Sequence, residues 1–212
     1  MNYKIISTGS KGNAVFMEDC EVLIDCGVSY KALNDIFRQI KVVLLTHQHS
    51  DHLNRSTLKR LLDERPSLRV GCPVYLYGIL TEEIKIPPER IDVYAYDLVY
   101  DYGEFAVMPF PVPHNVPNCG YILSTDAEKI FYATDVGNLD YISAEGCDMY
   151  FIEANYGEAE IEERISEKKL NGGFIYERDV LTNHLSYEQA MDFLLRNNTK
   201  GAEYVLLHKH ID

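Results

Sequence analysis

The sequence predicts a layered α/β protein, with strand-rich halves that are each flanked by helices. Short apolar or β-branched runs separated by turn residues fill the first quarter of the chain, and similar runs return in the middle and near the end. Segments with helical periodicity lie between them. No internal repeat, low-complexity tract or Pro/Gly-rich linker interrupts the 212 residues, so we expect a single domain over residues 1–212.

The first half of the chain is predicted from short strands and two helices. Ser29 is expected to cap a helix through Ile40, because Leu33, Ile36, Phe37 and Ile40 share one face. Residues 55–64 have an amphipathic helical pattern. The expected strands of this half are 3–7, 13–17, 21–25, 41–45, 73–77, 92–94, 98–101 and 104–110.

The second half follows the same rules, with longer helices. Residues 158–170 predict a highly charged helix, and residues 187–197 predict a helix with Ser186 as its N-cap. The expected strands of this half are 120–124, 129–133, 148–153 and 203–207.

Composition narrows the possible partners and compartment. The net charge of −13 disfavours nonspecific coating of nucleic acid, which rests on Lys and Arg, and favours a small substrate or a short stretch of polymer. Five scattered cysteines without a CxxC pair predict neither a zinc ribbon nor a disulfide framework, so we expect the cytoplasm. No apolar stretch reaches the ~18 residues of a membrane span, and we expect no membrane association.

A His-rich segment directly after strand 41–45 carries the strongest chemical signal. His47, His49, Asp51 and His52 place four metal ligands within six residues. On an extended backbone the side chains of residues 47 and 49 point to the same side, so both imidazoles can bind one ion. The following turn is expected to direct Asp51 and His52 toward a second ion nearby. Imidazole and carboxylate ligands suit Zn²⁺, Mn²⁺ or Fe²⁺. A polar surface turn that happens to contain three histidines is the alternative.

Three further donors stand just beyond apolar strands. His114 follows the strand that ends near Pro111, Asp135 follows residues 129–133, and His208 follows residues 203–207. Each could be structural when taken singly. As a set at strand ends they support one another, since a sheet delivers such residues to a shared edge.

This arrangement resembles the metallo-β-lactamase superfamily, whose signature is HxHxDH followed by a separate His, an Asp and a final His. Thr8–Asn13 and Leu23–Gly27 resemble a branch of small bacterial and phage hydrolases related to an exonuclease encoded beside a cell-wall two-component system. The His184–Ala190 stretch is more distantly similar to ribonuclease Z. The resemblance implies an αββα sandwich of two mixed sheets flanked by helices.

The resemblance also implies a binuclear site with two divalent ions, Zn²⁺ or Mn²⁺, with Fe²⁺ as an alternative, and a hydroxide between them as the nucleophile. The first ion would be bound by His47, His49 and His114. The second would be bound by Asp51, His52 and His208, with Asp51 also counted as catalytic, and Asp135 would bridge both ions.

His184 lies outside this ligand set and favours a phosphodiester substrate. In the nuclease and phosphodiesterase branches, the matching His contacts the scissile phosphate, and imidazole can protonate the leaving oxygen. Ser186 is expected either as the helix N-cap or as a substrate contact. Glu153 is expected to orient a histidine, either His184 or His208, and Asp25 to support the His-rich turn.

The segment 156–183 leaves two interpretations open. A loop with two aromatic residues and one arginine, namely Phe174, Tyr176 and Arg178, could stack a base and pair with phosphate, or it could form a dimer contact. The tyrosine-rich loops favour a homodimer as partner.

The predicted function is a metal-dependent phosphodiesterase or nuclease that acts on nucleic-acid ends or small, including cyclic, nucleotides. Alternatives are a hydrolase of carbon esters, lactones or thioesters on the same site, and a non-catalytic nucleotide-binding protein.

Overall fold

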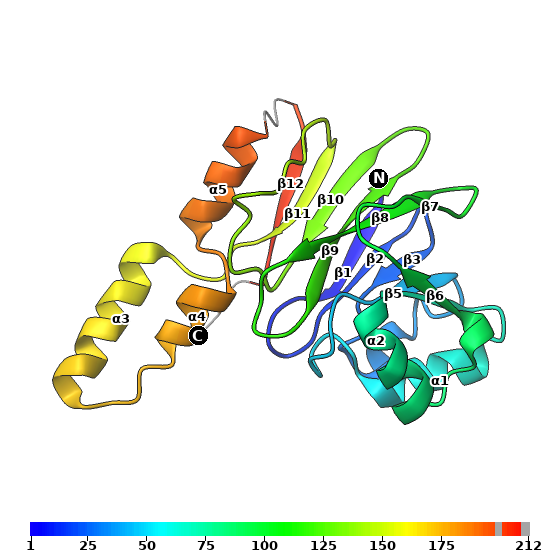
Figure 1. Ribbon diagram of the computed structural model, residues 1–212, viewed down its shortest axis with the longest axis horizontal. Helices are drawn as coiled ribbons and strands as arrows, with labels where there is room; N and C mark the ends of the chain where they lie inside the picture. Colours follow the sequence, from blue (N-terminus) through cyan, green and yellow to red (C-terminus); the bar gives the residue numbers. More distant parts are fainter. Residues whose placement is uncertain (198–200, 209–212) are drawn as a thin grey trace. The chain divides into compact units, whose positions relative to one another are not determined.

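The computed structural model describes residues 1–197 and 201–208 (Figure 1). The chain divides into two compact units, Met1–Phe110 (unit 1) and Pro111–Asp212 (unit 2). No helix among the described residues is both long and apolar enough to cross a membrane.

Unit 1 contains a six-stranded sheet in the order β1-β2-β3-β4-β5-β6. The first three strands are antiparallel, and β3 to β6 run parallel. Their short, nearly continuous apolar runs are buried, as expected for parallel strands covered on both faces. The strands are β1 (Tyr3–Ser7), β2 (Ala14–Met17), β3 (Val22–Ile24), β4 (Val42–Leu44), β5 (Arg69–Pro73) and β6 (Ile91–Tyr94).

The helices of unit 1 include one that was predicted well. Helix α1 (Arg55–Glu64) has the predicted bounds and begins at Asn54, whose side chain accepts a hydrogen bond from Thr57 N at 3.1 Å. The other helical elements are η1 (Tyr30–Leu33), α2 (Val74–Gly78), η2 (Ile79–Glu83) and η3 (Pro88–Arg90).

Two predictions in unit 1 are wrong. The helix expected over 29–40 is only the short 3₁₀ turn η1 followed by further turns, and the Ser29 side chain makes no cap hydrogen bond. Its apolar spacing still buries Leu33, Ile36 and Ile40, because successive turns place these residues on one side as a helix would. The strand expected over 73–77 is α2, since Pro73 is its extended N-cap and the strand itself ends there.

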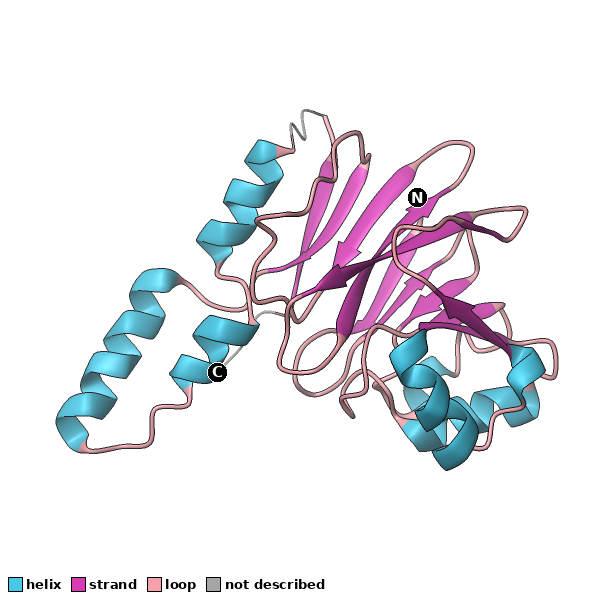
Figure 2. Ribbon diagram, in the orientation of Figure 1, coloured by secondary structure: helices cyan, strands magenta, loops and turns pink. Residues whose placement is uncertain are grey.

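The second six-stranded sheet has the order β12-β11-β10-β9-β8-β7. Strand β9 is antiparallel to β10, whereas β10, β11 and β12 run parallel. The strands are β7 (Tyr100–Asp101), β8 (Ala106–Val112), β9 (Asn118–Ser124), β10 (Lys129–Ala133), β11 (Met149–Glu153) and β12 (Glu203–Leu207). Two mixed sheets with flanking helices confirm the predicted α/β class (Figure 2).

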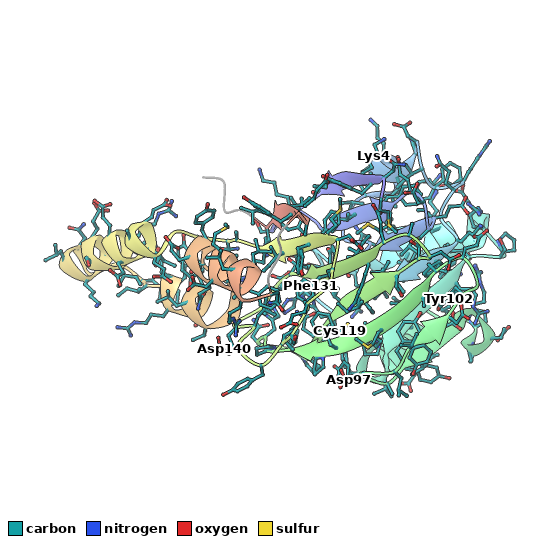
Figure 3. All side chains as sticks on the ribbon, turned by 90° about the horizontal axis from the view of Figure 1, so that it is seen from above. Lys4, Asp97, Tyr102, Cys119, Phe131 and Asp140 are labelled. Carbon is teal, nitrogen blue, oxygen red and sulfur yellow. The ribbon has the colours of Figure 1, made fainter. Side chains whose placement is uncertain are left out.

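Helix α5 (Tyr187–Arg196) covers the strands of unit 2. Phe193 is buried with its ring centroid 5.0 Å from that of Phe131 in β10. Figure 3 labels Phe131 among the strands and Asp140 near α5, and the Arg196 guanidinium donates to the Asp140 carbonyl at 3.1 Å. Ser186 and Gln189 form a capping box at the start of this helix.

Helices α3 (Glu158–Asn171) and α4 (Glu177–Asn183) form a pair that extends away from the strands of unit 2 (Figures 1 and 2). Helix α3 ends where predicted, because Gly172 takes a left-handed conformation and its N–H bonds to the Lys168 carbonyl. Helix α4 was not predicted. Its seven residues are too few to show a clear helical period in the sequence.

Candidate metal centre

The His-rich segment of unit 1 leaves the carboxyl end of β4 beside the end of β3. Ile24 pairs with Leu44, so Asp25 and Thr46 emerge next to each other. His47 and His52 are fully buried, and the His47 Nε2 lies 3.0 Å from His49 Nδ1. The imidazole nitrogens of residues 47 and 49 therefore converge, as their alternate positions in the sequence predict.

Asp25 contacts two residues of the His-rich segment, Thr46 and His52. Its buried carboxylate accepts hydrogen bonds from Thr46 N at 2.9 Å and Thr46 Oγ1, and lies 2.6 Å from His52 Nδ1. Burial raises the pKa of Asp25, although the charge and hydrogen bonds of His52 and Thr46 act against that rise. A carboxylate facing Nδ1 holds the proton on that nitrogen, so the His52 lone pair is presented at Nε2.

Replacement of Asp25 by asparagine is expected to weaken Zn²⁺ binding about 10- to 100-fold, because the His52 ring loses its carboxylate partner. Asn tolerates the left-handed backbone of this residue, whose φ is 60°, so the chain should still fold. Competition titration against a Zn²⁺ chelator measures the effect. The exposed Asp35→Asn variant is the control, and equal affinities in the two variants would contradict a role for Asp25 in the site.

Gly27 fixes the path of the His-rich segment. A Cβ at this residue would lie 1.6 Å from the Asp51 carbonyl oxygen, which accepts a hydrogen bond from Asn13 N at 2.6 Å. The neighbouring Cys26 N donates to the His52 carbonyl at 2.8 Å. These backbone contacts hold the turn that carries Asp51 and His52, and they leave no room for a side chain.

Gly27→Ala is expected to destabilise the protein by more than about 3 kcal/mol, because the methyl group overlaps backbone that cannot rotate away. Gly78→Ala is the matched control, since a Cβ there meets nothing within 4 Å. Its expected effect is a stabilisation of up to about 1 kcal/mol from helix propensity. Urea unfolding of both variants tests the contrast, and similar midpoints would show that the close approach at Gly27 is unimportant.

In unit 2, three adjacent parallel strands deliver polar residues to one edge of the sheet. Asp135 follows β10, Glu153 ends β11, and His208 follows β12. Asp135 and His208 have positive φ angles of 55° and 53°. The same conformation occurs at Asp25, and left-handed backbone at non-glycine residues is uncommon enough to mark these strand ends as special positions.

Glu153 joins two histidines through one buried carboxylate. Its Oε1 lies 2.7 Å from His184 Nδ1 and 2.9 Å from His208 Nδ1, while its Oε2 accepts a hydrogen bond from Val136 N at 2.8 Å. Burial alone would raise the pKa of Glu153, but the hydrogen bonds from His184 and His208 outweigh it and lower the pKa. The carboxylate is therefore ionised and orients both rings.

His208 also lies close to Asp135, with Nδ1 3.1 Å from Asp135 Oδ1. Burial would lower the pKa of His208, but the charges and hydrogen bonds of Asp135 and Glu153 overcome it and raise the pKa to about 10. Asn155 braces the same strand end, since its Nδ2 donates to the His208 carbonyl at 3.1 Å.

His184 belongs to this cluster of unit 2, and His114 lies beside His184. The His114 Nδ1 lies 3.1 Å from the Asn183 carbonyl oxygen, and its ring centroid is 5.6 Å from that of His184. His184 is the extended residue that ends α4. The contact of His184 with Glu153 places the proton on Nδ1 and leaves Nε2 as the other ring nitrogen.

The chemistry of both clusters fits divalent transition metals. Asp135, Glu153, His184 and His208 each offer a ligand atom, and these atoms lie within 4.8 Å of one another. Buried nitrogen and carboxylate donors of this kind suit Zn²⁺ or Mn²⁺. In unit 1 the convergent His47 and His49 nitrogens supply the same type of donor.

Other predicted site residues lie in different surroundings. Ser186 is buried, and its hydroxyl accepts from Gln189 N and donates to Glu158 at 3.0 Å each, which is the N-cap role. Tyr176 lines a pocket between α3 and α4, whereas Arg178 is exposed on α4 outside that pocket. Contact of these three residues with substrate stays a prediction.

Some supporting residues gave no usable signal in the sequence. Asn118 donates from Nδ2 to the carbonyls of Thr134, at 3.1 Å, and of Asp135, at 2.8 Å, and so holds the turn after β10. Glu177 is buried at the start of the unpredicted helix α4. A lone polar residue near Pro117 and one acid among many do not stand out without the fold.

Known structures share the fold of this chain. A metallo-β-lactamase fold protein, YhfI from Bacillus subtilis, matches with a TM-score of 0.73 and 16% identity, covering 99% of this chain and 86% of its own. The short form of human tRNase Z matches with a TM-score of 0.70 and 17% identity, covering 99% and 92%. A diphosphatase of the PhnP family matches at 0.64 and 14%, covering 98% and 86%. No curated protein shows significant sequence similarity to the chain.

The sequence itself identifies the family. Residues 21–209 match the model of the beta-lactamase superfamily domain. This span includes the His-rich segment and the cluster at the ends of β10, β11 and β12. The structural likeness to tRNase Z agrees with the resemblance to ribonuclease Z that the sequence predicts. The chain belongs to the beta-lactamase superfamily.

Proposed function

We propose that this protein is a metal-dependent phosphodiesterase that cleaves nucleic-acid ends or small nucleotides, including cyclic ones. The observation that carries the proposal is the ion pair of His184 with buried Glu153, at 2.7 Å, next to Asp135 and His208. A histidine that is oriented by a carboxylate is a suitable proton donor to a leaving oxygen.

The metal ligands in this proposal are those that the superfamily signature implies. His47, His49 and His114 would hold one ion, and Asp51, His52 and His208 the other, with Asp135 shared. The ions would supply an activated water and neutralise charge on the phosphoryl group. Asp51 and Asp135 contribute the negative charge that two cations require.

The chain's own residues then account for the remaining steps. Glu153 holds the proton of His184 on Nδ1, so the imidazole reaches the substrate through Nε2 and passes a proton to the departing oxygen when it is cationic. The buried carboxylate also fixes the orientation of the ring, so that Nε2 points away from Glu153. His184 is only partly exposed, with 19% of its side chain accessible, so substrate can reach one edge of the ring.

Similarity of fold to a tRNase Z and a diphosphatase supports phosphorus chemistry over attack on a carbon ester. The strong negative charge of the chain favours short substrates over long nucleic acid. Cleavage of nucleic-acid ends or small nucleotides, among all phosphodiesters, is part of this proposal.

Hydrolysis of bis-p-nitrophenyl phosphate by protein loaded with Mn²⁺ or Zn²⁺ tests the function. We expect turnover with at least one metal and none after treatment with a chelator. A fully loaded protein without turnover would contradict the proposal. A 5′-labelled single strand and a set of cyclic nucleotides then separate a nuclease from a nucleotide hydrolase, and a lactone or thioester substrate tests carbon-ester chemistry.

A further inference from the structure

A pocket lies between α3 and α4 in unit 2, outside the clusters of candidate metal ligands. Its polar wall is formed by Asn155, Glu160, Arg164 and Glu177, and two tyrosine rings, Tyr156 and Tyr176, face the same space. The cavity volume is about 40 Å³, and the pocket is partly open to solvent.

The charges around this pocket are already paired. Arg164 contacts Glu160 at 2.8 Å, and Lys168 forms an ion pair with Glu177 Oε1. Because each carboxylate has its own cation, the pocket has little net attraction for a free metal ion or a second anion. A neutral ligand with hydrogen-bonding groups suits it better.

Glu177 provides the specific feature. Only 2% of this residue is exposed, and within the part of the chain that the structure describes its Oε2 has no hydrogen-bond partner. A buried acceptor in this state lacks a donor that it requires. Burial would raise the pKa of Glu177, but the hydrogen bond of Lys168, the backbone N–H of Glu177 itself and the charges of Lys168 and Arg164 outweigh it and lower the pKa. The group is therefore ionised and can only accept.

The tyrosines add a surface for an aromatic ring. Tyr176 is 41% exposed, and the ammonium group of Lys168 lies 3.9 Å from its ring centroid. Tyrosine rings at the mouth of a pocket can stack a base, which contributes binding that does not depend on its identity. Glu177 would discriminate between bases, because only some bases can donate an N–H to its unpaired oxygen.

The backbone of the pocket is continuous with the candidate catalytic cluster of the same unit. Asn155 N donates to the Leu185 carbonyl at 2.9 Å, and Asn155 Nδ2 donates to the His208 carbonyl. Helix α4 begins with Glu177 and ends at His184, and its seven residues span about 10 Å. A ligand in the pocket would thus lie within a nucleotide's length of His184.

We propose that the α3–α4 pocket binds the base of the substrate nucleotide, with Glu177 accepting N–H donors from a guanine edge and Tyr176 contacting the ring. Guanine presents two adjacent donors on its Watson–Crick edge, whereas the other bases offer an ionised carboxylate fewer donors and bring acceptors close to it. This inference rests on the proposed function, because it names the base of the same substrate.

Calorimetric titration with the four nucleoside monophosphates tests this inference without requiring any hydrolysis. Guanosine monophosphate should bind about tenfold more tightly than the other three, and Glu177→Gln should remove that preference, because the charged acceptor is lost. A second series with short oligonucleotides ending in G, A, C or U shows whether the guanine is read on a free nucleotide or on a strand end. Preference for guanine in either series, lost in the variant, supports the pocket.

Controls separate this inference from folding and from catalysis. Glu163→Gln removes an exposed charge from the same helix pair and should keep the preference. Tyr176→Ala should weaken all bases together without changing their order. Hydrolysis of bis-p-nitrophenyl phosphate by the parent protein tests the catalytic proposal separately, because this substrate has no base, so failure of that proposal would be seen there and not in the titrations. Absence of base preference, or its persistence in Glu177→Gln, would overturn the inference and show that the pocket does not select a base.

Discussion

Replacement of His184 by alanine is expected to lower kcat for a dinucleotide phosphodiester, whose sugar alkoxide must be protonated as it leaves, by about 10²- to 10⁴-fold, the usual contribution of a positioned acid or base. The proton donor to the leaving oxygen is lost, while Glu153 keeps its contact with His208 at 2.9 Å. Steady-state kinetics at saturating substrate measure the change, and metal analysis should show unchanged ion content.

The Thr182→Ala variant is the control for this experiment. Thr182 is exposed in the last turn of α4, and its hydroxyl donates to the carbonyls of Arg178 and Asp179 in the same helix. It should retain full activity. If His184→Ala kept its rate on phosphodiesters, or lost activity equally on a carbon ester, the assignment of His184 to leaving-group protonation would be wrong.

Replacement of Asp135 by asparagine is expected to reduce bound metal below two ions per chain and to lower kcat by about 10³-fold. The shared carboxylate is the group that the proposal places on both ions, and the amide carries no charge. Asparagine keeps the left-handed backbone of this residue, so the effect should be on metal and activity with little change in unfolding. Elemental analysis after dialysis, together with kinetics, gives the two readouts.

Asp140→Asn is the matched control, because Asp140 is exposed in the loop that follows Asp135. It should bind metal and turn over substrate as the parent protein does. A full complement of two ions in Asp135→Asn would show that this carboxylate is not a shared ligand, and would redirect attention to Glu153 within the same cluster.

The chemistry of the site could be predicted from the sequence because its signals are local or lie at strand ends. His47 and His49 occupy alternate positions directly after a strand, so their spacing predicts the convergence of the two imidazoles that the structure shows. Asp135 and His208 each follow a clear apolar strand. Parallel pairing of β10, β11 and β12 then places their carboxyl ends at one edge.

Helix boundaries were predictable only where propensity and capping agree. Helix α1 has both an amphipathic face and an Asn54 cap, and its bounds were found. The segment 29–40 has an apolar face but no side-chain hydrogen bond from an N-cap residue, and it forms turns. The segment 74–78 is rich in residues that favour strands, but it follows Pro73 at the end of β5 and forms a helix.

The sequence by itself determined the family, the α/β class and the types of ligand, because these depend on residue identity, spacing and period. Only the tertiary structure showed that one buried carboxylate, Glu153, contacts both His184 and His208. It alone revealed Glu177 in a pocket between α3 and α4. The two contacts of Glu153 join residues 31 and 55 positions apart, and the Lys168–Glu177 ion pair joins residues 9 positions apart. No local pattern in the sequence encodes which of these distant side chains meet. Packing decides that, and with it the hydrogen bonds through which Glu153 orients both histidines.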